Sequence, residues 1–126
     1  MMAIRNADID GNPATTPDPS WTPLLVTPNH PEYPGAHPCG TGAQAEVYAA
    51  ALGTRHIAVK IHGSAGGTPN NWAATETFKH VSDLQRQIVD ARVWAGLHYR
   101  GSGDAGLVLA RKVSHWALRR YFQPVS

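Results

Sequence analysis

One segment in the second half of the chain carries apolar residues at helical spacing. Leu84, Ile88, Ala91 and Ala95 recur every three or four residues, which is typical of the buried face of a helix. Ser82, with a glutamine three residues later, fits a capping box at the start of such a helix. The pattern therefore predicts a helix that begins near Ser82.

The same periodicity continues closer to the C-terminus and predicts a helix from about Asp104 to Phe122. Arg119 and Arg120 would lie in its last turns, where cations complement the helix dipole. The predicted inward face consists of Ala110, Val113, Ala117 and Tyr121, and the opposite face of Arg111, Lys112, His115 and Arg119.

An earlier helix is predicted from Gly42 to Leu52. Thr41 and Gln44 fit a capping box, and Gly53 supplies a stop. Residues 56–62 then alternate between apolar and polar, which indicates a short strand. Residues 63–71 are rich in Gly, Asn and Pro and are expected to form a loop.

The first 38 residues have a different character, because eight of the ten prolines lie between Pro13 and Pro38. Proline removes a backbone donor and disfavours the helical conformation of the residue before it, so a long helix is excluded here. We expect an extended but ordered segment, because it also contains apolar residues that could anchor it: Trp21, Leu24, Leu25, Val26 and Tyr33.

Composition narrows the function classes. Eleven Lys and Arg against nine Asp and Glu leave a formal charge of +2, so no nucleic-acid partner is expected. Cys39 is the single cysteine, and no Cys/His spacing matches a structural zinc site. The sequence shows no signal-peptide pattern and no stretch of roughly 20 apolar residues. We therefore expect a soluble chain without a membrane span, in a compartment that the sequence does not identify.

Two segments carry residues suited to binding a small anion. Residues 31–38 form a proline-bounded turn that places His37 just ahead of a helix, and residues 90–100 hold Arg92 six positions before His98. On an unbroken helix, six residues turn through about 600°, so the two side chains would diverge by about 120°. Gly96 offers a break that lets both reach one pocket. Two histidines, an arginine and a helix N-terminus suit a tetrahedral oxyanion.

In this order, the two segments resemble the second and third signature motifs of the vanadium-dependent haloperoxidase and type 2 phosphatidic acid phosphatase superfamily. Those motifs read Pro-Ser-Gly-His, and Ser-Arg followed by five residues, His, three residues and Asp. The resemblance to bacterial haloperoxidase-like members extends over nearly the whole chain. It implies a mainly α fold: a helical-bundle fragment with a Pro-rich extended N-terminal segment and at most one short strand or hairpin. We expect residues 1–126 to form a single partial domain, with the extended segment at 1–38 and the helical part at 39–126.

The resemblance also implies roles for individual residues. His98 would be the nucleophile of a phosphatase or the apical vanadium ligand of a haloperoxidase. His37 would be the general acid and base. Arg92 would neutralise an oxygen of the anion, and the backbone amides of Gly35 and Ala36 would donate to another.

The chain departs from the motifs at three places. Gly35 replaces the motif serine, and Ser102 stands at the position of the motif aspartate, the carboxylate that would orient His98. Ser102 itself, or Asp104 two residues later, is the candidate to take over this orienting role. The first motif, a lysine followed seven residues later by Arg-Pro, does not occur in these 126 residues, and Arg5 does not match it. This pattern is expected of a chain truncated before the first motif, or of one whose start is misassigned.

Two activities stay open on this basis: halide oxidation by peroxide with vanadate as cofactor, and phosphomonoester hydrolysis without a cofactor. The alternative is a non-catalytic remnant that binds phosphate-like anions weakly or is purely structural. Enzymatic activity of the 126 residues alone is therefore expected to be low. The expected partners are a small oxyanion and a small-molecule substrate, with self-association through exposed apolar helix faces.

Several conspicuous residues receive no role in the site. We interpret the other five histidines (His30, His56, His62, His80 and His115) as surface or packing residues, and we do not expect zinc. Trp72, Trp94 and Cys39 are expected in the core. Arg100 either lines the anion pocket or lies at the surface.

Overall fold

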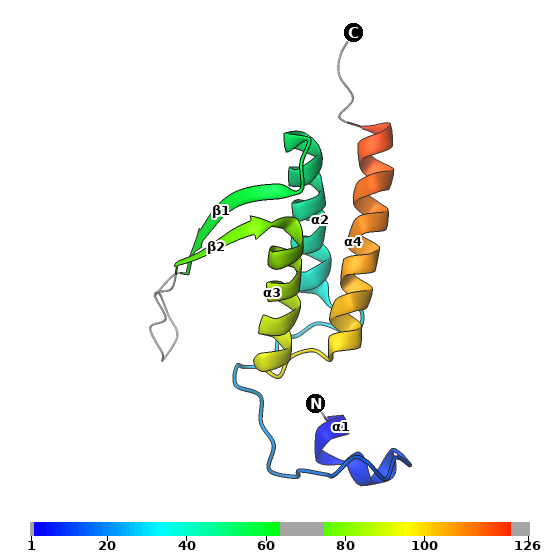
Figure 1. Cartoon of the computed structure of the whole chain (residues 1–126). Helices are drawn as coiled ribbons and strands as arrows, with labels where there is room; N and C mark the ends of the chain where they lie inside the picture. Colours follow the sequence, from blue (N-terminus) through cyan, green and yellow to red (C-terminus); the bar gives the residue numbers. More distant parts are fainter. Residues whose placement is uncertain (1, 64–74, 122–126) are drawn as a thin grey trace.

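Three helices stand side by side, with α2 between α3 and α4 (Figure 1). The computed structural model describes residues 2–63 and 75–121. Its elements in chain order are α1 (Met2–Arg5), a 3-10 turn η1 (Ala7–Ile9), α2 (Ala36–Leu52), β1 (His56–His62), β2 (Thr75–His80), α3 (Val81–Trp94) and α4 (Arg100–Arg120). The prediction of a mainly helical chain with at most one hairpin is confirmed.

Small residues allow α2 and α4 to approach closely. A Cβ atom on Gly42 would lie 2.9 Å from both the Ala110 Cβ and a Leu107 methyl carbon. A Cβ atom on Gly106 would lie 2.5 Å from the carbonyl oxygen of Gly35. Such distances are shorter than van der Waals contact, so the helices can pack at this separation only because both positions are glycine.

The buried face of α4 differs from the predicted one. Val113 and Tyr121 are 51% and 53% exposed, whereas Ala110 is fully buried. The buried residues are Ser102, Gly103, Gly106, Ala110 and Ser114. Small size rather than hydrophobicity selects this face, because α2 lies too close for larger side chains.

Helix α2 begins at Ala36, six residues before the predicted start, so Thr41 is an interior residue and not a cap. Pro38 is the third residue of the helix. The first amides of a helix have no acceptor within it, so proline is tolerated there. The predicted stop is confirmed: Gly53 caps the helix with φ of 65°, in the left-handed region.

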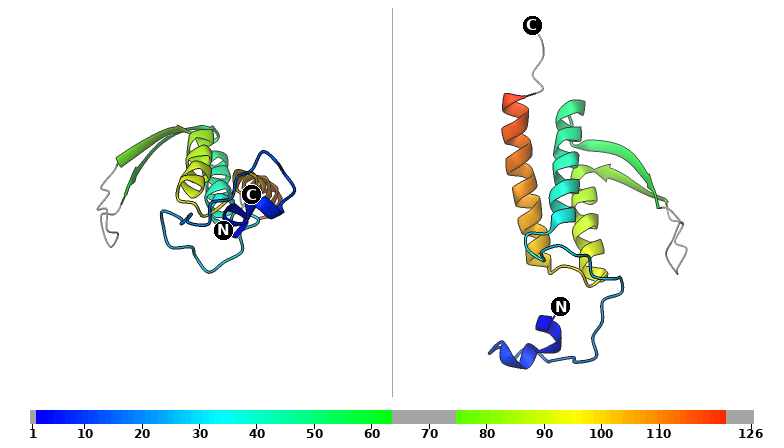
Figure 2. Two further views of the ribbon diagram at one scale, coloured as in Figure 1. Left: turned by 90° about the horizontal axis from the view of Figure 1, so that it is seen from below. Right: turned by 180° about the vertical axis from the view of Figure 1, so that it is seen from behind.

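The hairpin and one end of the helices form the main apolar core. β1 matches the predicted strand, and β2 pairs with it antiparallel, with Val59 opposite Phe78. Phe78 and Ile57 pack with Val81 and with Ala45 and Ala49. α3 begins at Val81, where the Asp83 carboxylate accepts a hydrogen bond from the His80 amide at 3.1 Å. The hairpin projects to one side of the helices (Figure 2).

A buried carboxylate on α2 links the helices to the hairpin. The Glu46 side chain is 2% exposed and accepts two hydrogen bonds from the Arg55 guanidinium, at 2.8 and 3.0 Å. Gln85, on α3, donates a third at 2.8 Å. The hydrogen bonds from Arg55 outweigh the opposing effect of burial and, with Gln85, hold the pKa of Glu46 below its ordinary value.

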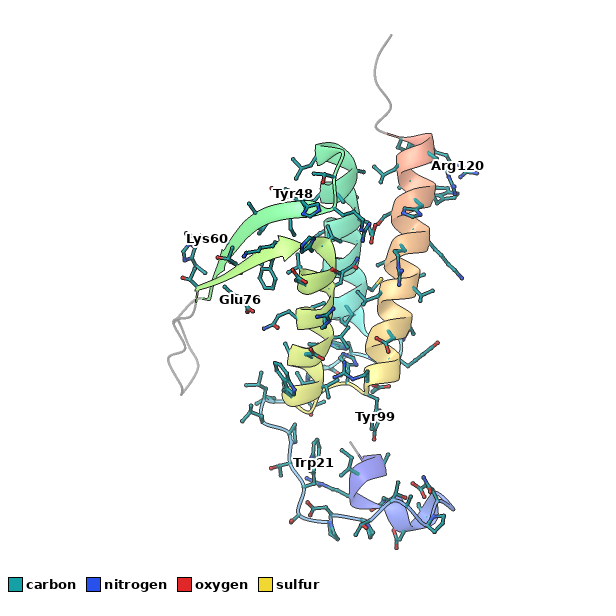
Figure 3. All side chains as sticks on the ribbon, viewed as in Figure 1. Trp21, Tyr48, Lys60, Glu76, Tyr99 and Arg120 are labelled. Atoms are coloured by element: carbon teal, nitrogen blue, oxygen red, sulfur yellow. The ribbon has the colours of Figure 1, made fainter. Side chains whose placement is uncertain are left out.

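The N-terminal segment passes below the lower ends of the three helices (Figures 1 and 3). It is ordered, with the short α1 and η1 and a cis Tyr33–Pro34 bond. Most of the expected apolar anchors are exposed, among them Val26 at 93% and Leu24 at 61%. Trp21 is the exception, because its ring packs against Gly96.

Two further placements differ from the sequence-based expectation. Trp94, expected in the core, is 66% exposed, and Cys39 is only partly buried. Trp72 lies outside the described residues. Several large apolar side chains of α2 and α4 are exposed, including Tyr48 and Trp116. Within residues 2–63 and 75–121, no helix has both the length and the hydropathy that a membrane crossing requires.

Candidate anion site

Three helix ends meet at the lower end of the molecule: the start of α2, the end of α3 and the start of α4 (Figure 1). His37 lies in the first turn of α2, Arg92 in the last turn of α3, and His98 in the short link to α4. The predicted site residues therefore come from three neighbouring elements. Figure 3 marks this end of α4 with Tyr99, the residue before the helix.

The link between α3 and α4 brings His98 back toward Arg92. α3 ends at Trp94, and Gly96 has φ of 72°, in the left-handed region that favours glycine. The amides of Leu97 and His98 then both donate to the carbonyl of Arg92, at 3.0 and 3.3 Å. The sequence predicted a break at Gly96, and the structure has one there.

Two constraints select glycine at position 96. Besides its positive φ, a Cβ atom there would lie 2.9 Å from the Trp21 ring and 3.1 Å from the Pro23 Cα. The N-terminal segment thus packs directly against the turn that places His98.

His98 is 2% exposed, and a backbone group fixes its orientation. Its Nδ1 lies 2.6 Å from the carbonyl oxygen of Glu32. A carbonyl can only accept, so Nδ1 carries the proton and donates. In the neutral ring, Nε2 then carries the lone pair, as a nucleophile or an apical ligand requires.

The side chain of Glu32 holds this backbone in place. One carboxylate oxygen accepts from the Tyr99 amide at 2.8 Å, and the other from the Ser102 hydroxyl at 2.7 Å. Burial alone would raise the pKa of Glu32, but these hydrogen bonds and the charge of His98 together lower it. The ionised carboxylate also lies at the N-terminus of α4, where the helix dipole favours a negative charge.

His30, interpreted from the sequence as a surface or packing residue, packs within the same cluster. Its ring is stacked on that of His98, with centroids 5.5 Å apart and planes 16° apart. The His37 ring lies 5.7 Å away on a tilted plane. Three imidazoles therefore adjoin one another at this end of the bundle.

Four buried nitrogen atoms in this cluster have no hydrogen-bond partner: Nε and one terminal nitrogen of Arg92, and the Nε2 atoms of His30 and His98. Within the described part of the chain, no other buried side-chain nitrogen or oxygen lacks a partner. An unpaired buried polar group costs roughly 1–3 kcal/mol. The two Arg92 nitrogens can only donate, whereas the Nε2 atoms of His30 and His98 donate or accept according to the protonation of the ring.

The pKa values of two residues in the cluster are shifted. Burial first, and then the positive charges of Arg92, His30 and His98, lower the pKa of His37. Burial also lowers the pKa of Arg92. The neighbouring positive charges oppose protonation of His37, and a bound anion would relieve this effect.

His98 and His37 border different hollows, and Arg92 borders neither of these two. A small cavity of about 60 Å³ is bordered by His30, Glu32 and His98. His37 instead borders a shallow, open depression with Ala36 and other residues of α2. The structure therefore does not show the single cavity expected for His37, Arg92 and His98, although it makes these residues neighbours.

The predicted role of the Gly35 amide needs correction. This amide donates to the carbonyl of Ser102 at 2.8 Å, so it is not available to an anion. Ala36 is the first residue of α2, and its amide has no acceptor within the helix. Of the two predicted backbone donors, only Ala36 stays a candidate.

The two residues proposed to orient His98 have different positions. Ser102 is buried and binds Glu32 instead of the imidazole. Asp104 is exposed on α4, and the partner of His98 Nδ1 is the Glu32 carbonyl, so Asp104 does not take the place of the motif aspartate. Arg100 pairs with Asp90 at 2.7 Å and lies at the surface.

Across the described ranges, no group of three or more His, Cys, Asp or Glu residues has a geometry that could hold a metal ion. The three imidazoles are stacked or tilted against one another and do not converge on a point. The donor set suits an anion better than a cation.

The chain matches one family model, described as the VCPO second helical-bundle domain, over residues 3–126. Among solved structures it resembles a holo-type bacterial vanadium-dependent chloroperoxidase, with a TM-score of 0.67 and 20% identity over 80% of this chain and 23% of that one. The apo-type bacterial enzyme gives a TM-score of 0.60 and 19% identity over 79% and 24%. The chain thus spans about a quarter of the length of these structures. A comparison with curated protein sequences finds no match.

Proposed function

The chain belongs to the family of the VCPO second helical-bundle domain, and from this premise we propose that His37, Arg92 and His98 form part of an oxyanion site that binds vanadate. The proposal takes up the haloperoxidase resemblance at the level of individual residues. It assigns the site to the end of the bundle where α2, α3 and α4 meet.

The four unpartnered buried nitrogens carry this proposal. A guanidinium donates and cannot accept, an imidazole does the same once both of its nitrogens are protonated, and the Glu32 carboxylate beside His98 is already engaged by Tyr99 and Ser102. A ligand that satisfies these donors must offer several acceptor oxygens and negative charge. Vanadate, phosphate and sulfate share this chemistry.

Each residue has a role that follows from its position. Arg92 would supply fixed positive charge to an oxygen of the anion. The buried Nε2 of His98 would offer its lone pair to vanadate when the ring is neutral, and would donate to an oxygen of sulfate or phosphate when the ring is protonated. His37 is exposed and can exchange a proton with solvent, as a general acid or base requires. Bound vanadate would supply a Lewis-acidic centre at which peroxide oxidises a halide.

The anion should bind more tightly at low pH than at high pH, since protonated imidazoles add charge and donors to the site. Sulfate is the suitable probe because its own charge is constant between about pH 5.5 and about pH 8.5. We expect calorimetric titration of the 126-residue chain to give about tenfold or greater tightening at the lower pH.

Arg92→Ala should weaken sulfate binding about ten- to a hundredfold, because it removes a charge-assisted hydrogen bond. Arg86→Ala is the matched control, since Arg86 is an exposed arginine on the same helix, and its affinity should stay within about twofold of wild type. Vanadate and phosphate should compete with sulfate. Equal binding at both pH values, or equal losses for the two variants, would rule the site out.

A further inference from the structure

We infer that Glu32 replaces the aspartate of the third motif as the carboxylate that positions His98, with Ser102 as its anchor. The inference rests on the proposed function, because it takes His98 as the imidazole that faces the anion. It assigns a role to a residue that lies just before the four residues matching the second motif, 34–37, and 66 positions away from His98.

The contacts of Glu32 carry the argument. Its backbone carbonyl accepts from His98 Nδ1 at 2.6 Å, while its carboxylate bridges the Tyr99 amide and the Ser102 hydroxyl. The residues on both sides of the start of α4 are thereby tied to one side chain. The hydrogen bonds of the Glu32 carboxylate to Tyr99 and Ser102 therefore hold the Glu32 carbonyl against the His98 imidazole.

The carboxylate also acts on the imidazole directly. One of its oxygens lies 3.5 Å from His98 Nδ1, beyond good hydrogen-bond distance but close enough for charge attraction. His98 is nearly fully buried, so this attraction is screened less than at the surface. The carboxylate therefore favours the proton on Nδ1 and leaves Nε2 facing the ligand.

Serine at position 102 follows from the presence of Glu32. An aspartate there would place a second carboxylate against the first, and like charges at such distances repel strongly. The small hydroxyl instead donates to Glu32 at 2.7 Å. Glu32 and Ser102, which lie in two separate segments, thus orient His98 together, as the single aspartate of the third motif would. Glu32 touches no anion and is a positioning residue.

The tautomer of His98 gives a direct readout, because it can be measured without any ligand. In wild type, nitrogen NMR of the neutral ring should show the proton almost entirely on Nδ1. Glu32→Ala should give a mixture of both tautomers and about tenfold weaker sulfate binding. Glu76→Ala, a change in an exposed glutamate of the hairpin, should alter neither.

Moving the carboxylate provides the decisive variant. Ser102→Asp alone should weaken sulfate binding, because two carboxylates then face each other. Combined with Glu32→Ala, the same change should restore both the tautomer and an affinity within about threefold of wild type. A residue that only stabilises the fold would lower thermal stability without such a rescue.

The outcomes separate this inference from the proposed function. Wild-type tautomer and affinity in Glu32→Ala, or a double variant no better than the single one, would overturn the role of Glu32. If wild type bound no sulfate, the proposed anion site would fail. A tautomer shift in ligand-free Glu32→Ala, reversed by Ser102→Asp, would still establish Glu32 as the positioning residue.

Discussion

Replacing Arg55 with methionine is expected to destabilise the chain by about 2–4 kcal/mol, the largest effect of any single change considered. The Glu46 carboxylate is buried and receives two of its three side-chain hydrogen bonds from Arg55. Without them it stays buried with only Gln85 as a hydrogen-bond donor, and a buried charge that has lost its partner costs several kcal/mol. The exposed position of Arg55, 55% for its side chain, puts the estimate below the upper end of that range.

The same pair predicts a pH dependence. The folded pKa of Glu46 is lowered, so its contribution to stability is present above the ordinary value of 4.5 and is lost as the pH falls through the folded pKa. Urea unfolding near pH 7 and below about pH 4 should show this loss in wild type and little of it in Arg55→Met. The double variant Arg55→Met/Glu46→Met removes both charges and should recover most of the stability. If the single variant were as stable as wild type, Glu46 would not depend on Arg55.

Gly106→Ala is expected to destabilise the chain by about 1–3 kcal/mol and to disturb the anion site as well. The new methyl group would lie 2.5 Å from the Gly35 carbonyl oxygen and 3.1 Å from the Cys39 amide nitrogen. Both belong to the backbone at the start of α2, which must therefore shift, and it carries His37. Sulfate affinity should fall together with the unfolding midpoint.

Gly101→Ala is the matched control for this change. Gly101 lies on the same helix, and a Cβ atom there meets nothing within 4 Å. Alanine at this position should be neutral or stabilising by up to about 1 kcal/mol, because it favours the helix over the unfolded chain. A destabilisation equal to that of Gly106→Ala would show that close packing of α2 on α4 is not the cause.

The sequence predicts the elements well where local chemistry decides them. Residues 56–62 alternate and form a strand, and Gly53 ends α2 as expected. The Thr41/Gln44 capping-box pattern predicts the start of α2 six residues too late, because the helix includes Pro38, and a helix tolerates proline in its first turn. The face of α4 was misassigned because close approach to α2 requires small residues, a constraint that hydrophobic periodicity does not contain.

The site residues also differ in whether local sequence predicts them. Motif spacing predicts His37, Arg92 and His98 as site residues, and helix geometry predicts the break at Gly96 that the structure has. The sequence does not predict His30 and Glu32 as site residues, because their contacts come from the tertiary structure. Glu32 contacts residues 66 to 70 positions away in the sequence. The His30 ring contacts His37 on α2 and His98 in the α3–α4 link. One signal was available: His30 and Glu32 are two residues apart in an extended segment, where alternate side chains share a side.

Locating a bound anion tests the central claim most directly. Selenate has the shape and charge of sulfate, and its selenium atom gives an anomalous diffraction signal in soaked crystals of the chain. We expect the strongest peak beside Arg92 and His98, with selenate oxygens within about 3.2 Å of the guanidinium and of His98 Nε2. The peak should be lost in Arg92→Ala crystals. A peak only at surface arginines such as Arg119 or Arg120, or none, would contradict the account.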